Sequence, residues 1–194
     1  GNVIKNGIPV AIVGAPNAGK STLLNALLNE ERAIVSDIAG TTRDTIEDEI
    51  SIGGIGFRFI DTAGIRDTQD QIEQLGIAKT FEKIEQAQLV VYMVDLKKCH
   101  EDLAVITADA AALQKLKETY PKKPLLVLGN KADLISADAV AKIKETITDL
   151  SPLSAKEKEG IESLKEAFLN VVHTGALHNN DTIVSNSRHY DALL

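Results

Sequence analysis

The sequence predicts an α/β fold in which a mostly parallel sheet of six strands is covered by helices on both faces. Three observations lead to this prediction. Short apolar runs alternate with longer segments of helical periodicity, several runs are apolar at nearly every position, and one pair of runs flanks Gly53-Gly54. Nearly continuous apolar strands are typical of parallel sheets that are buried on both faces. The Gly-Gly turn indicates a hairpin, which adds one antiparallel edge strand.

The first half of the chain supplies three of the strands. Residues 8–13 are apolar throughout and stop at a glycine, which predicts a buried strand. Leucines recur three or four positions apart in residues 20–29, which predicts a helix. Residues 31–43 have no sustained period, so we expect a long loop, a feature that is usually functional or disordered in a compact domain. Residues 45–52 and 55–60 are the two strands of the predicted hairpin.

The second half repeats the alternation of helix and strand. Residues 89–94 and 124–128 are apolar runs that predict two more buried strands, and residues 149–153 predict a short sixth strand. Apolar residues at helical spacing lie before, between and after these strands. The expected helices are 72–85, 103–116, 140–147 and 161–172.

Composition and charge limit the classes of function. One domain is the usual expectation for 194 residues, and a hydrophobic share of 44% can fill a sizeable core without disulfides. The 21 Lys and Arg against 28 Asp and Glu give a net charge of −7, which argues against a broad RNA- or DNA-binding face but not against a local anion site. The single cysteine, Cys99, excludes an internal disulfide framework. The longest strongly apolar run, 89–94, is too short to cross a bilayer, and no charged-then-apolar leader opens the chain, so we expect a cytosolic domain without membrane contact.

The two ends of the chain suggest a piece of a longer protein. There is no initiator methionine, and residues 174–186 are rich in Gly, Asn, Asp, Ser and Thr, as linkers are. Residues 187–194 resume a helical pattern and stop abruptly. We therefore expect one folded domain over residues 1–173, followed over residues 174–194 by a linker and the first turns of a truncated neighbouring domain.

The strongest functional motif follows the first predicted strand. Gly14-Ala15-Pro16-Asn17-Ala18-Gly19-Lys20-Ser21 fits G-x-x-x-x-G-K-[ST] between a strand and a helix, the context that identifies a phosphate-binding P-loop. Its glycines let backbone N–H groups face phosphate oxygens, and the helix N-terminus adds positive potential. Lys20 would reach the outer phosphates, and Ser21 would ligate Mg²⁺. The residues expected to contact the phosphates are Asn17, Ala18, Gly19, Lys20, Ser21 and Thr22.

A second motif, Asn130-Lys131-Ala132-Asp133, follows the strand predicted at 124–128. A carboxylate can accept hydrogen bonds from both N1–H and the exocyclic amine of guanine, a donor pair that adenine lacks, so Asp133 would select GTP over ATP. Alone, this motif could be a solvated turn, but together with a P-loop at this separation it predicts guanine recognition. Ser154-Ala155-Lys156, after the last short strand, would support the guanine from the other side, although small polar residues are also common helix caps.

Two further segments are expected near the γ-phosphate and Mg²⁺. Asp61 would hold Mg²⁺ through water, and Gly64 would let a backbone N–H approach the γ-phosphate. In the long loop, a threonine hydroxyl would join the P-loop serine on Mg²⁺ when the γ-phosphate is present, and Thr42 is favoured over Thr41 because it lies nearer the following strand. The nucleotide-contacting residues expected in these two segments are Ser36, Asp37, Ile38, Ala39, Gly40, Thr41, Thr42, Asp61, Thr62, Ala63 and Gly64.

In this order, the motifs over residues 14–156 resemble those of GTP-binding G domains, which have a P-loop NTPase fold. Within that superfamily the chain resembles the MnmE (TrmE) family of tRNA-modification GTPases, which is related to the Era and EngA families. The resemblance covers essentially the whole chain. It does not include that family's N-terminal folate-binding domain, most of its helical domain or its C-terminal cysteine motif. The segments that carry it are 14–25, 33–44, 61–66, Ile72-Glu73, Gly76-Ile77 and the tail Ser187-Arg188-His189-Tyr190.

The resemblance also implies a particular route to hydrolysis. Ras-like GTPases carry a water-orienting glutamine after the D-T-A-G motif, and this position is Ile65 here, which cannot hydrogen-bond water. In the MnmE family, K⁺ takes the place of an arginine finger, and a glutamate beyond the motif, matched here by Glu73, orients the water. The residues that match the K⁺ ligands are Asn17, Ser36, Ile38 and Thr41. The implied catalytic set is Glu73, Lys20, Asn17 and Gly64.

Simpler explanations stay open at several of these positions. Asn17 could only brace the P-loop turn, and Glu73 could be an ordinary solvated residue of a first helical turn. Arg43 and Arg66 could act as arginine fingers, but such residues more often form surface ion pairs.

Three functions are consistent with the sequence. The leading hypothesis, implied by the resemblance, is a K⁺-stimulated GTPase domain that pairs as a homodimer through its switch faces. The full protein would then act with the flavin-dependent MnmG (GidA) on the wobble uridine of tRNA, with the tRNA contact outside this domain. The alternatives are a GTP-dependent interaction module with little turnover and a ribosome-assembly GTPase of the Era or EngA kind.

Overall fold

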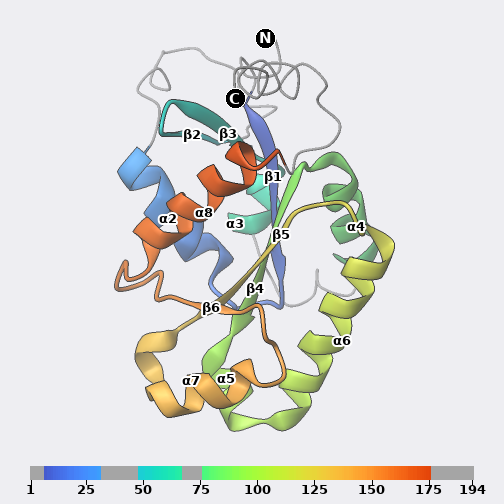
Figure 1. Ribbon diagram of the computed structural model, residues 1–194, viewed down its shortest axis with the longest axis vertical. Helices are drawn as coiled ribbons and strands as arrows, with labels where there is room; N and C mark the ends of the chain where they lie inside the picture. Colours follow the sequence, from blue (N-terminus) through green and yellow to red (C-terminus); the bar gives the residue numbers. More distant parts are fainter. Residues whose placement is uncertain (1–6, 32–47, 67–75, 176–194) are drawn as a thin grey trace.

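The central feature of the fold is a six-stranded sheet with the strand order β2-β3-β1-β4-β5-β6 (Figure 1). The computed structural model describes residues 7–31, 48–66 and 76–175. Strand β2 runs antiparallel to β3, and every other neighbouring pair is parallel. The predicted fold class is therefore confirmed. The strands are β1 (Ile8–Gly14), β2 (Glu49–Ile52), β3 (Ile55–Phe59), β4 (Leu89–Asp95), β5 (Leu125–Asn130) and β6 (Ser151–Pro152).

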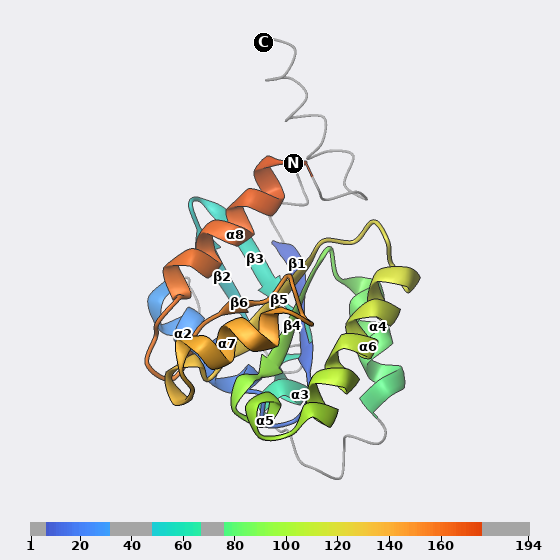
Figure 2. The ribbon, with the colours of Figure 1, turned by 60° about the horizontal axis from the view of Figure 1, so that its bottom comes forward.

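Helices cover both faces of this sheet, so the molecule has three layers (Figure 2). Helices α2 and α8 pack on one face, and α4 and α6 pack on the other, where α5 and α7 extend the same apolar cluster. The helices are α2 (Lys20–Glu31), α3 (Thr62–Arg66), α4 (Gly76–Gln86), α5 (Leu96–Glu101), α6 (Leu103–Thr119), α7 (Ala137–Lys144) and α8 (Ile161–His173), with a 3₁₀ turn η3 (Ala132–Leu134).

The continuous apolar strands divide their side chains between two core clusters. In β1, Ile8, Val10 and Ile12 join the cluster under α2 and α8, whereas Ala11 and Val13 join the cluster under α4 and α6. This division follows from the two-residue period of a strand, which sends successive side chains to opposite faces. A strand buried on both faces needs apolar residues at every position, and this is why the run predicted its place in the sheet.

Several element boundaries differ from the sequence prediction. Residues 61–71 were expected to form a loop, but α3 occupies 62–66. Helix α5 is also unexpected. The Asp95 side chain accepts a hydrogen bond from the Lys98 amide and caps it, and Asp102 then ends α5 and caps α6. Both helices begin at an aspartate cap, but only the second, α6, has the apolar periodicity that predicts a helix. This explains why periodicity alone found only α6.

Parts of four predicted elements lie outside the described residues. They include the long loop from residue 32 onward, residues 72–75 of the predicted helix 72–85, and the tail from residue 176 onward. The first residues of the strand predicted at 45–52 also lie there, and the described part of that strand begins at Glu49. The remaining predicted helices and strands are all present, with ends shifted by a few residues.

A buried polar cluster joins β4 to α5 and α6. The Tyr92 hydroxyl donates to Asp109 Oδ1 at 2.8 Å, and the Cys99 thiol lies 3.8 Å from Asp109 Oδ2. Burial raises the pKa of Asp109 above its ordinary value of 3.8, although the hydrogen bonds from Tyr92 and Cys99 act in the opposite direction. Burial, with the nearby Asp109 charge second, raises the pKa of Cys99 to about 12. The buried Cys99 thiol therefore stays protonated and packs as a small apolar group.

The raised pKa of Asp109 predicts a pH-dependent contribution to stability. Because the folded carboxyl binds its proton more tightly than the unfolded one, its contribution is fully present below pH 3.8 and is lost as the pH rises through the raised folded pKa. Asp109→Asn keeps an acceptor for Tyr92 and removes this loss, at about 1.4 kcal/mol for each unit by which the pKa is raised. Urea unfolding should show the variant gaining on the parent between pH 4 and neutrality. Parallel pH curves for the two proteins, with exposed Asp138→Asn as the control, would contradict the assignment.

Candidate nucleotide-binding site

The predicted motifs meet at one edge of the sheet. The P-loop follows β1, Asp61 follows β3, Asn130 ends β5, and Ser154 comes two residues after β6. These are the carboxyl ends of neighbouring parallel strands, at the lower end of Figure 1 where α5 and α7 are drawn. In open α/β sheets, ligands bind at this edge, where strand order reverses. Strand β1 lies between the β3 side and the β4 side, so the P-loop occupies that reversal point.

The P-loop backbone has the conformation that its glycines and asparagine predict. Gly14 and Gly19 have φ of +145° and +101°, and Asn17 has φ of +67°. A Cβ at Gly14 would overlap the Met93 carbonyl oxygen, and a Cβ at Gly19 would overlap the Asn130 side-chain nitrogen. Only glycine fits at both positions, so strand and loop backbones approach more closely than any side chain would allow.

The loop ends where its helix begins, and this arrangement is suited to binding an anion. Helix α2 starts at Lys20, and its first helical bond runs from the Leu23 amide to the Gly19 carbonyl at 2.9 Å. The first N–H groups of a helix have no partner within it, and they lie at the positive end of its dipole. The Lys20 ammonium donates to the carbonyls of Gly14 at 2.8 Å and Ala15 at 3.0 Å, so its charge lies across the loop.

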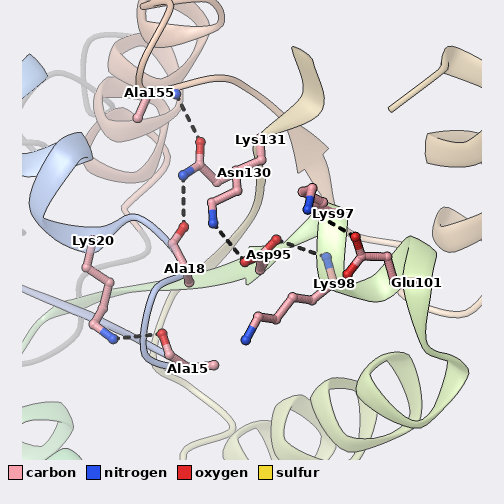
Figure 3. A network of polar contacts seen from close by, with 10 residues as sticks. All are labelled: Ala15, Ala18, Lys20, Asp95, Lys97, Lys98, Glu101, Asn130, Lys131 and Ala155. Carbon is pink, nitrogen blue, oxygen red and sulfur yellow. Dashed lines mark hydrogen bonds and ion pairs between the residues drawn. The ribbon is translucent and has the colours of Figure 1, made fainter. Parts of the chain in front are cut away.

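Asn130 joins the P-loop to the two loops that were predicted to read the base (Figure 3). Its side-chain nitrogen donates to the Ala18 carbonyl at 2.8 Å, and its oxygen accepts from the Ala155 amide at 2.9 Å. Asn130 and Ala155 are 3% and 2% exposed, and Ala18 is fully buried. An amide side chain is the group that can donate at one end and accept at the other. The three predicted motifs are therefore connected through one residue.

The predicted base-reading residues are placed by this connection. Lys131 follows Asn130 in a left-handed conformation, with φ of +71°, and the chain then turns through η3, which contains Asp133. The Asp133 side chain is exposed and accepts no hydrogen bond from any described residue. The Ala132 amide donates to the Leu153 carbonyl at 3.0 Å, which ties this turn to the Ser154 loop.

Ser154 and its neighbours form the loop that Asn130 joins to the P-loop. Ser154 and Ala155 are buried, whereas Lys156 is exposed. The Ser154 hydroxyl accepts from the Glu157 amide at 3.2 Å, and its backbone pairs with Glu159 in both directions at 2.9 Å. The serine thus holds a tight turn, and the helix-capping alternative is wrong because α8 begins at Ile161 after Gly160.

The D-T-A-G segment continues into α3 rather than into an open turn. Asp61 has φ of +56°, and the Gly64 amide donates to the Asp61 carbonyl at 3.1 Å. Thr62 is fully buried, and Ala63 is exposed. Ile65 is 2% exposed and packs in the core cluster with α2, so this position contributes to packing and not to water positioning.

Two charged residues near the site were missed by sequence reasoning. The Lys83 ammonium of α4 donates to the Ile12 carbonyl of β1 at 3.3 Å, and burial lowers its pKa while the nearby Asp61 charge raises it. Asp95 is the last residue of β4, and its carboxylate pairs with the Lys131 ammonium. An acidic residue directly after the run 89–94 was a signal that could have identified Asp95, whereas Lys83 had no signal because its partner is a distant backbone carbonyl.

Oxygen donors suited to Mg²⁺ are present among the described residues. Magnesium binds through few protein ligands and keeps waters and substrate phosphates. The Ser21 hydroxyl, in the first turn of α2, and the Asp61 carboxylate fit that donor chemistry. Within residues 7–31, 48–66 and 76–175, no group of three His, Cys, Asp or Glu side chains could hold a metal ion by itself. The other predicted ligands, Ser36, Ile38, Thr41 and Thr42, and the predicted base Glu73 lie outside the described residues.

The three-layer sheet, the P-loop after β1 and the guanine motif at the end of β5 define a P-loop G domain. The family model described as a 50S ribosome-binding GTPase matches residues 9–131. The chain belongs to this family of GTP hydrolases, which bind guanine nucleotide. Among the described residues, no helix is long and apolar enough to pass through a bilayer.

Comparison with curated proteins supports the resemblance to the MnmE family. The chain is 62% identical over 194 residues to the tRNA modification GTPase MnmE of Flavobacterium psychrophilum, and 61% identical over 198 residues to that of Flavobacterium johnsoniae. The MnmE of Bacteroides thetaiotaomicron is 48% identical over 200 residues. Each match covers the whole of this chain and 41–42% of the relative. The chain therefore spans about two fifths of the length of these relatives.

Solved structures with the same fold include other G domains. The FeoB G domain from Methanococcus jannaschii is 31% identical with a TM-score of 0.51, over 84% of this chain and 96% of that one. A GTP-binding protein from Sulfolobus solfataricus in complex with GDP is 22% identical with a TM-score of 0.56, over 84% and 52% of the two chains. The second likeness shows the fold alone.

Proposed function

We propose that this GTPase domain is a K⁺-stimulated, dimerisation-coupled switch in a cytoplasmic protein that modifies the wobble uridine of tRNA. The similarity to MnmE relatives, which covers the whole of this chain and about two fifths of theirs, supports the tRNA-modification role. In the proposal, the full protein acts with the flavin-dependent MnmG (GidA), and residues 174–194 lead from the G domain over residues 1–173 into a helical domain. The net charge of −7 supports a tRNA contact outside this domain.

Base recognition is assigned to Asp133. Its carboxylate is exposed at the edge of the site and unpaired among the described residues, so both oxygens are available to the N1–H and exocyclic amine of guanine. Asn130 holds the turn that carries it against the P-loop, so the base and phosphate contacts keep a fixed separation.

Asp133→Asn should therefore exchange the nucleotide preference. An amide cannot accept both guanine protons, and losing a charge-assisted contact costs roughly 1.5–3 kcal/mol. Xanthosine diphosphate carries an oxygen at C2 and suits the amide donor, so its affinity should rise. Calorimetric titration of both diphosphates measures the change. Unaltered GDP affinity in the variant would rule out this role for Asp133.

Magnesium binding is assigned to Ser21, Thr42 and, through water, Asp61. When bound, Mg²⁺ neutralises the charge that develops between the β- and γ-phosphates. Ser21 lies at the start of α2, and its hydroxyl makes no hydrogen bond to another described residue, so it is free to serve as a ligand. The Lys20 ammonium would leave its carbonyl partners, Gly14 and Ala15, for the outer phosphates.

One observation carries the K⁺ proposal: Ile65 is buried in the core, so the D-T-A-G segment supplies no side chain to orient water. Positive charge and water positioning must then come from elsewhere. Asn17 is exposed on the P-loop in a left-handed conformation, and its side chain makes no hydrogen bond to a described residue. The turn is closed instead by the backbone, from the Ala18 amide to the Ala15 carbonyl at 3.2 Å. These contacts favour a ligand-facing role for Asn17 over a bracing role.

The remaining parts of the proposed mechanism lie on the loop and helix beyond the described residues. Asn17, Ser36, Ile38 and Thr41 would hold K⁺, which supplies the charge of an arginine finger. Glu73 would orient the attacking water, and Gly64 would donate its amide to the γ-phosphate after releasing Asp61. Pairing of two G domains across their switch faces would complete the site.

Hydrolysis should be fast in K⁺, slow in Na⁺, and should rise faster than linearly with protein concentration. An arginine finger is worth about 10³–10⁵ in rate, so the cation effect should be large. Asn17→Ala should abolish the K⁺ response, whereas Asn25→Ala, an exposed asparagine of α2, should keep it. Glu73→Ala should slow hydrolysis but leave K⁺-dependent pairing intact. Single-turnover rates with each cation, combined with light scattering, measure both effects.

Equal rates in K⁺ and Na⁺ at concentrations that allow pairing would overturn this mechanism. Slow hydrolysis under every condition would instead support a GTP-dependent interaction module.

A further inference from the structure

Asp95 occupies a position at which the base site, β4 and α5 meet (Figure 3). It is the last residue of β4, it is in register with Asn130 on β5, and it is 3% exposed. Its Oδ1 accepts from the Lys98 amide at 3.0 Å, and its Oδ2 pairs with the Lys131 ammonium at 2.9 Å. Each carboxylate oxygen therefore has a different partner: a backbone amide of α5 for Oδ1, and for Oδ2 the side chain of the residue that follows β5.

Lys131 pairs with Asp95, and no ion pair joins it to Asp133 among the described residues. Asp133 belongs to the same four-residue motif and follows Lys131 by two positions. The Lys131 ammonium nevertheless forms its ion pair with Asp95. The lysine is 31% exposed and its carboxylate partner 3% exposed. Leaving a buried carboxylate without its partner is strongly unfavourable, so the ammonium is held there more firmly than by a surface ion pair.

The alternative pairing would disable base recognition. An ammonium on Asp133 would occupy oxygens that must accept two hydrogen bonds from guanine. Within the described residues, Asp133 accepts none, in agreement with an ammonium retained by Asp95. The backbone at Lys131 is left-handed, with φ of +71°, and the chain enters the η3 turn that carries Asp133 directly after it.

We propose that Asp95 is a positioning residue for guanine recognition. It retains the Lys131 ammonium at the end of β4 and thereby keeps the Asp133 carboxylate available to the base. The inference rests on the proposed role of Asp133. It adds a residue outside the predicted motifs to the set that determines nucleotide specificity.

Asp95→Asn tests this role in the whole chain. Its amide oxygen still accepts from the Lys98 amide and caps α5, but the ion pair with Lys131 is lost. GDP affinity, measured by calorimetry, should fall by about 5- to 30-fold, the range that 1–2 kcal/mol produces. The ratio of GDP to IDP affinity should fall as well, because inosine lacks the exocyclic amine and does not need both Asp133 oxygens.

A double-variant cycle identifies the route of the effect. In a Lys131→Met background the ammonium is absent, so adding Asp95→Asn should change GDP affinity and the GDP-to-IDP ratio little. Glu101→Gln is the matched control, since it removes an exposed carboxylate of α5 that pairs with Lys97. That control should keep the parent's affinity and ratio.

The outcomes separate this inference from the proposed function. If Asp133→Asn binds GDP as tightly as the parent, the assignment of Asp133 fails first. If Asp133→Asn behaves as expected but Asp95→Asn leaves the ratio unchanged, or weakens GDP equally without Lys131, the positioning role is overturned. Asp95→Ser, which keeps a capping oxygen, is the second variant. If neither variant folds, as judged by circular dichroism, Asp95 is a structural residue and the proposal is wrong.

Discussion

The two hydrogen bonds of the Asn130 side chain are the constraint on which the rest of the site depends. Parallel strands bring the ends of β1 and β5 to the same edge but do not fix the loops that follow them. Asn130 fixes the P-loop through the Ala18 carbonyl and the Ser154 loop through the Ala155 amide. Because these groups are almost completely buried, each bond is expensive to lose. The same contact requires glycine at position 19, where a Cβ would overlap the asparagine.

Local charge around this joint differs from the charge of the whole molecule. The net charge is −7, yet Lys20, Lys83 and Lys131 all direct ammonium groups to the carboxyl edge of the sheet. Two of them donate to backbone carbonyls, and the third pairs with buried Asp95. Each of these ammonium groups is held by a fixed acceptor, so the positive charge is concentrated at one edge of the sheet and does not make the whole surface attractive to nucleic acid. The phosphate-binding motif therefore located a local anion site that the overall charge does not reveal.

The fold and most of the motifs could be predicted because they follow from local patterns. Apolar runs buried on both faces identified β1, β4 and β5, and the Gly-Gly turn identified the β2–β3 hairpin. Helix α5 was missed because six residues between two aspartate caps show no period. No helix was predicted directly after Asp61, where the structure has the short helix α3, whose Ile65 is buried in the core cluster with α2. Lys83 and the Asp95–Lys131 pair depend on contacts between residues 36 or more positions apart, which no local pattern records.

The central claim is that the Asn130 side chain joins the P-loop to the Ser154 loop without the help of nucleotide. Hydrogen exchange of the Ala155 amide, followed by NMR in nucleotide-free protein and after GDP addition, tests it most directly. The account predicts strong protection of this amide without nucleotide, because it donates to a buried oxygen, and only a modest increase with GDP. An Ala155 amide that exchanges as fast as an exposed loop amide until GDP is added would contradict it.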